Sequence, residues 1–76
     1  MKKVKILLAG TNPDTKARLV RGLSFMLESI EYVETSGEAD VIIPAHIYSS
    51  DRILGLKKKA LVDQIEVKHK QINGIR

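Results

Sequence analysis

The chain has 76 residues, of which 43% are hydrophobic and 29% are charged, and its formal net charge is +4 at pH 7. This composition is typical of a globular protein and excludes a disordered or fibrous one, and the length predicts a single domain over residues 1–76. The absence of cysteine excludes disulfides, thiolate metal sites and thiol nucleophiles. No apolar run approaches the roughly 18 residues of a membrane span or forms a secretory signal, so we expect a cytoplasmic protein with no membrane partner.

The N-terminal part predicts a strand, a turn and a helix. Residues 2–9 have a nearly unbroken apolar centre, which predicts a central strand of a parallel sheet covered on both faces. Gly10 and Thr11 begin a turn, Asn12 can cap a helix, and Pro13 falls at the first helical position, where its missing N–H costs nothing. Apolar spacing then predicts an amphipathic helix from residue 13 to about residue 28.

Two further strands are expected in the middle of the chain. Residues 31–35 alternate in the manner of an edge strand, and residues 39–43 form a second buried strand. The connection between them is too short for the helix that a parallel crossover usually contains. Two interpretations are open: residues 31–35 pair antiparallel with the next strand as a hairpin, or the crossover is an irregular loop.

The C-terminal part predicts a second helix. Pro44 ends the preceding strand, and Ser49 or Ser50 can cap a helix after the loop of residues 45–50. Residues 65–73 fit either a strand or a continuation of this helix closed by Asn73-Gly74. We favour a helix to about Asn73.

The residues of the first and third predicted strands resemble those of a known family. Residues 5–8 (Lys-Ile-Leu-Leu) followed by residues 12–19 (Asn-Pro-Asp-Thr-Lys-Ala-Arg-Leu) resemble the start of response-regulator receiver domains, and residues 39–43 resemble their third strand. In that family two acidic residues after the first strand hold magnesium, and an aspartate that ends the third strand accepts a phosphoryl group. Here the matching positions are Gly10, Thr11 and Ala45, or Pro44 in the neighbouring register, so neither the metal site nor the nucleophile can form.

The resemblance covers about the first 45 residues and implies an atypical, non-phosphorylated receiver-like domain. Such a domain is a non-catalytic interaction or regulatory module without metal or cofactor, and it is either minimal or the N-terminal fragment of a larger receiver-like protein. The fold class predicted is α/β: a small three-layered flavodoxin/receiver-like half-fold, with a mainly parallel three-stranded sheet in order 2-1-3 and two main helices.

The turn after the first strand is one candidate site. Gly10, Thr11 and Asn12 precede a helix N-terminus, where free N–H groups can bind an anion, and His46 follows a strand that ends at the same edge. These residues would serve a small phosphate-ligand-binding domain or an enzyme-subunit fragment. A simple capped turn is the alternative, and we assign no catalytic residue.

A basic surface is the second candidate site. Residues 1–43 hold six Lys or Arg against six Asp or Glu, whereas residues 44–76 hold seven against three. A spacing of about eleven residues, close to three helical turns, predicts one basic stripe made by Lys57, Lys58, Lys59, Lys68 and Lys70. Such a stripe would suit a nucleic-acid-associated factor. Binding of single strands also needs stacking aromatics, and none of the three aromatics is beside these lysines.

The third candidate is an interaction edge. In a sheet of order 2-1-3, Val41, Ile42 and Ile43 belong to an edge strand, and a bare apolar edge invites pairing with another chain. We therefore expect a protein partner or a homodimer.

Overall fold

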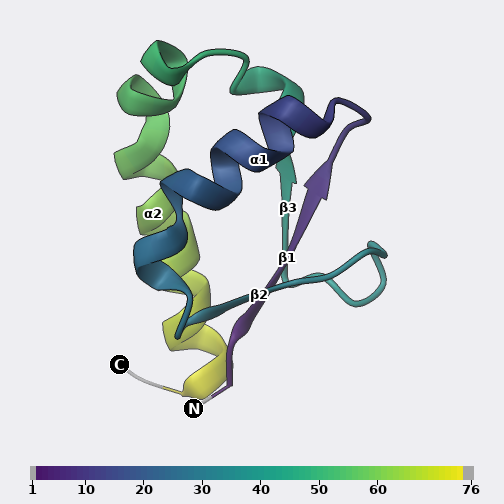
Figure 1. The fold of residues 1–76 in the computed structure, drawn as a ribbon. Coiled ribbons are helices and arrows are strands. Elements are labelled where there is room, and N and C mark those ends of the chain that lie inside the picture. The colour runs from purple at the N-terminus through teal and green to yellow at the C-terminus, as the bar shows by residue number, and fades with distance from the viewer. Residues whose placement is uncertain (1, 75–76) are drawn as a thin grey trace.

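The computed structural model describes residues 2–74 (Figure 1). Short 3₁₀ turns, η1 and η2, separate the helices and strands. The elements in chain order are β1 (Val4–Ala9), α1 (Pro13–Gly22), η1 (Ser24–Met26), β2 (Ile30–Tyr32), β3 (Val41–Pro44), η2 (Ala45–Ile47) and α2 (Asp51–Asn73).

The three strands form one sheet in the order β2-β1-β3, and β1 pairs parallel with both neighbours. The predicted α/β class, the strand order and the two main helices are therefore confirmed. Of the two interpretations of the β2–β3 connection, the irregular loop is right, because residues 33–40 contain no helix or strand. The antiparallel hairpin is wrong.

The sheet carries helices on one face only. α1 and α2 contact each other and lie side by side in Figure 1. Residues alternate along the strands: Val4, Ile6 and Ile43 are buried, whereas Lys5 and Ile42 are exposed. The molecule therefore has two layers. The prediction of three layers, with the first strand covered on both faces, is wrong.

The short β2–β3 connection explains the missing layer. A right-handed crossover from β2 past β1 to β3 runs in the opposite direction to the β1–β2 crossover, so it passes over the face that α1 does not cover. A helix there would need a crossover of a dozen or more residues, and residues 33–40 are too few. That face of the sheet therefore stays open.

α1 begins as predicted and ends early. The Asn12 side chain accepts a hydrogen bond from the backbone N–H of Asp14 at 2.9 Å, and Pro13 opens the helix. The predicted helix to about residue 28 instead ends at Gly22, and η1 follows. A Cβ on Gly22 would lie 2.9 Å from Leu54 Cδ2, so the glycine lets α1 approach α2 closely at the point where the chain turns back.

α2 confirms the helical interpretation of residues 65–73. The Ser50 hydroxyl accepts from the backbone N–H of Ile53 at 3.2 Å and caps the start of the helix. Gly74, at φ 66°, closes the end in the left-handed conformation that glycine adopts without strain. Leu54, Leu61 and Ile65 point from α2 into the core.

One polar atom in the described core lacks a partner. The Tyr32 hydroxyl, at the end of β2, is buried without a hydrogen bond in the part of the chain that the structure describes. Leaving a buried hydroxyl unpaired costs free energy, because its hydrogen bonds to water are lost on folding.

Tyr32→Phe should raise the free energy of unfolding by about 1 kcal/mol, because it removes this unpaired hydroxyl and keeps the ring. Urea unfolding measures the change. Tyr48→Phe is the matched control, since Tyr48 is a core residue without an unpaired buried hydroxyl. A loss of stability in Tyr32→Phe would show that the hydroxyl has a partner.

The free energy of unfolding should also fall at high pH, because the Tyr32 hydroxyl ionises there. Burial raises the pKa of the Tyr32 hydroxyl above its ordinary value of 10.0. The folded state therefore favours the protonated hydroxyl. The free energy of unfolding keeps its full value with respect to this group below the unfolded-state pKa, and it falls as the pH rises through the folded-state pKa. In urea titrations at increasing pH, the advantage of Tyr32→Phe over the wild type should widen above pH 10.0. A constant difference would contradict the assignment.

Candidate functional site

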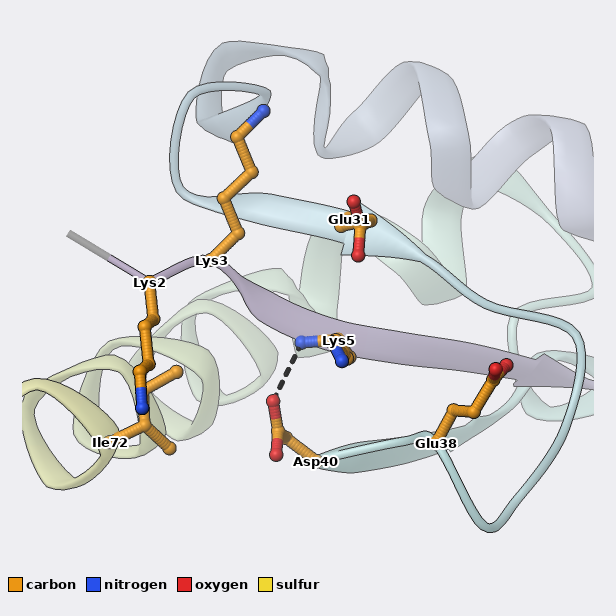
Figure 2. A pocket seen from close by; sticks show the side chains of 7 residues that line it. All are labelled: Lys2, Lys3, Lys5, Glu31, Glu38, Asp40 and Ile72. Atoms are coloured by element: carbon orange, nitrogen blue, oxygen red, sulfur yellow. Dashed lines mark hydrogen bonds between the residues drawn. The ribbon is translucent and has the colours of Figure 1, made fainter.

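The open face of the sheet is formed by outward-pointing residues of neighbouring strands. Lys5 of β1 lies in register with Glu31 of β2, and Leu7 of β1 lies in register with Ile42 of β3. In Figure 2 the side chains of Lys5 and Glu31 both leave their strands on the same side. We use the term open face for Lys5, Leu7, Glu31 and Ile42.

Asp40 extends the pairing of β1 with β3 beside this face. The Lys5 N–H donates to Asp40 Oδ2 at 2.9 Å, and the Asp40 N–H donates to the Lys5 carbonyl oxygen at 2.7 Å. The Asp40 carboxylate thus takes the place of a backbone carbonyl acceptor, at the residue just before β3 begins. Asp40 therefore fixes where β3 begins and holds the end of the 33–40 loop against β1.

A shallow depression of about 570 Å³ lies at the amino end of the open face (Figure 2). Three amines, from β1 and the residues before it, and three carboxylates, from β2 and the loop of residues 33–40, surround it, and α2 adds Ile72. No ion pair within 4.0 Å joins these groups among residues 2–74. Their charges are therefore available to a partner. The lining residues are Lys2, Lys3, Lys5, Glu31, Glu38, Asp40 and Ile72.

The carboxyl half of the open face is apolar. Ile42 is 50% exposed, and its register partner Leu7 is half-buried beside it. An exposed isoleucine within a sheet is the kind of surface that a second layer usually covers. The open face thus combines an apolar half with a charged half.

The predicted interaction edge stays a prediction, and the structure shows which of its side chains reach solvent. β3 is an edge strand, but Val41 is only 6% exposed and Ile43 only 1%, because alternation along the strand directs both into the core. Of the three predicted residues only Ile42 reaches solvent, and it does so on the sheet face. The exposed apolar side chain of β3 therefore lies on the open face.

The structure places the turn after β1 next to the residues that follow β3, as the sequence predicts. A Cβ on Gly10, whose φ is +134°, would lie 3.8 Å from Ala45 Cβ and 4.0 Å from the backbone N of His46. Thr11 and Asn12 are exposed, as is His46. The Asn12 side-chain oxygen is already occupied by the Asp14 N–H, so this end of α1 has the geometry of a capped turn.

Arg18 makes two contacts that the sequence analysis did not predict. Its Nε donates to Asp51 Oδ1 at 2.9 Å, and its guanidinium also donates to the Tyr48 carbonyl oxygen at 3.2 Å. The two contacts join α1 to the loop before α2 and to Asp51, the first residue of α2. No local pattern marks them, because the partners are 30 and 33 residues away in the chain.

The basic residues of α2 do not form the single predicted stripe. An α-helix turns about 100° per residue, so Lys57, Lys58 and Lys59 point in three directions. The eleven-residue spacing instead aligns Lys57 with Lys68 and Lys59 with Lys70 along separate lines of the helix. Lys57, Lys59 and Lys70 are exposed, whereas Lys58 and Lys68 are half-buried.

An aromatic ring lies beside these lysines, which the sequence analysis did not predict. The Lys58 Nζ is 5.1 Å from the centroid of the Phe25 ring. η1 carries Phe25 to the flank of α2, and the two elements border a groove of about 350 Å³. The groove is lined by Phe25, Met26, Ser29, Glu66, His69 and Lys70.

Comparisons with protein-family models, with curated proteins and with solved structures find no match to this chain. Within residues 2–74, no helix is long and apolar enough to cross a bilayer. The described residues also contain no group of three or more His, Asp or Glu placed to hold a metal ion.

Arg18→Ala should lower the free energy of unfolding by about 1–2 kcal/mol, because the Tyr48 carbonyl loses a charged donor in a partly buried position. The pair with Asp51 adds little, since the Asp51 side chain is 86% exposed. Urea unfolding measures the loss. Arg21→Ala, at an exposed position of the same helix, is the control and should change stability by less than about 0.5 kcal/mol. Equal losses in both variants would contradict the assignment.

Proposed function

We propose that this chain is a non-catalytic, receiver-like regulatory module that acts by binding protein through the open face of its sheet. One observation carries the proposal: an all-parallel sheet has helices on one face only. Parallel sheets occur almost exclusively with both faces covered. The proposed partner supplies the layer that the short 33–40 loop does not.

The character of the open face supports this role. Leu7 and Ile42 form an apolar half, and charged residues surround the depression beside it. Stable interfaces likewise combine apolar contact area with polar groups that give orientation.

The partner that fits this face is a second copy of the chain. Three amines and three carboxylates surround the same depression, so the charge of this surface is balanced. In a two-fold dimer, a residue that contacts a second residue of the partner is itself contacted by the same pair in reverse. The lysines of each chain can therefore face the carboxylates of the other. A chain of 76 residues also gains stability from burying a further surface.

The strand-end turn supports a role without phosphoryl transfer. Gly10 and Ala45 occupy positions where the resembling family has carboxylates, and they lie together at the carboxyl end of the sheet. Ala45 is fully buried. A magnesium ion and a phosphoacceptor both need oxygen ligands that glycine and alanine side chains do not supply.

Ile42→Asp should weaken self-association by roughly tenfold or more, about 1.4 kcal/mol, because it places a charge in the apolar half of the interface. Sedimentation equilibrium over a wide range of protein concentrations measures the dissociation constant. Val67→Asp is the matched control, since Val67 is 55% exposed on α2, away from the open face.

The control should dimerise like the wild type. A wild-type chain that stays monomeric at every concentration would overturn the second copy as partner. Equal weakening by Ile42→Asp and Val67→Asp would show that association does not use the open face.

A further inference from the structure

The groove between η1 and α2 lies in the helical layer and shares no lining residue with the depression at the open face. Its volume is about 350 Å³, within the range of small-ligand sites. Phe25 stands at its border and is 64% exposed. A large aromatic ring so exposed loses the benefit of burial, so its place at a groove points to a binding role.

The Phe25 ring is held in place by its neighbour. The Lys58 ammonium lies 5.1 Å from the ring centroid, within the range of a cation–π contact. This contact attracts one face of the ring to α2 and orients the side chain. Phe25 is therefore a positioned flat surface beside a positive charge.

A second positive charge lies at the groove. Lys70 lines it together with His69, and Lys58 aligns with His69 because eleven residues are close to three helical turns. Residues 44–76 hold seven Lys or Arg against three Asp or Glu, so the helix that forms this wall belongs to the basic part of the chain. Glu66 is the one carboxylate in the lining.

We infer that this groove binds single-stranded nucleic acid, with one base stacked on Phe25 and the adjoining phosphates on Lys58 and Lys70. Aromatic rings combined with a basic groove bind single strands with little sequence choice, because every base has a flat face. Glu66 can accept a hydrogen bond from an exocyclic amino group of the stacked base and keeps phosphates toward the lysines. A duplex is disfavoured, since its base faces are already stacked.

An acidic protein segment satisfies the lysines and leaves Phe25 unused. Use of the Phe25 ring therefore distinguishes a single-stranded nucleic acid from an acidic protein segment as the ligand of the groove. The inference is independent of the proposed dimer, because the two surfaces share no residue.

Fluorescence anisotropy with a labelled single-stranded oligonucleotide of about 12 nucleotides tests the inference on the whole chain. Phe25→Ala should weaken binding about tenfold or more, because stacking on the ring is lost. Leu27→Ala is the matched control: Leu27 is also an exposed apolar residue next to η1, but it does not line the groove. It should bind within about twofold of the wild type. Circular dichroism confirms that both variants are folded.

Lys70→Ala should reduce the dependence of the logarithm of affinity on the logarithm of salt concentration by about 0.7, the value for one phosphate contact on a single strand. Phe25→Trp should retain or strengthen binding, since the larger ring still stacks. Unchanged binding in Phe25→Ala, or equal affinity for a duplex of the same length, would overturn the inference. A poly-glutamate peptide that competes as well as the oligonucleotide would do the same.

Discussion

The length of the β2–β3 connection decides the architecture of this molecule. The strands run parallel in the order β2-β1-β3, so residues 33–40 must return past β1 without room for a helix. One face of the sheet is therefore left without a layer, and the whole core forms on the other. α2 is accordingly long, at 23 residues, and it supplies Leu54, Leu61 and Ile65 to the single covered face. The exposed Ile42 and the charged depression both follow from the same constraint.

Features set by neighbouring residues could be predicted from the sequence. Asn12 and Pro13 mark the start of α1, Ser50 marks the start of α2, and Gly74 marks its end, because caps depend on side-chain and backbone groups only a few residues apart. The strand order could be predicted as well. The number of layers is predicted wrongly, because the nearly unbroken apolar centre of β1 indicates cover on both faces, whereas the short connection of residues 33–40 decides for one.

The candidate sites divide in the same way. Gly10 and His46 were expected at one edge because parallel strands end together, and they do lie together. The contact of Lys58 with Phe25 joins residues 33 positions apart, and it depends on α1 ending at Gly22 so that η1 can turn toward α2. No periodic pattern in the sequence predicts that turn. For this reason the spacing of the lysines alone predicts a basic stripe without an aromatic ring.

The two proposed surfaces reinforce each other through their placement. A dimer formed through the open face buries the sheets of both chains and leaves both helical layers outside, so each dimer carries two grooves bordered by Phe25 and α2. A single strand long enough to reach both grooves binds the second one at high effective concentration, and its overall affinity exceeds that of one groove without any new contact. In the proposed assembly, the modest site on each copy thus gains affinity from association. Any change of the open face that weakens the dimer would then weaken the binding of long strands more than that of short ones.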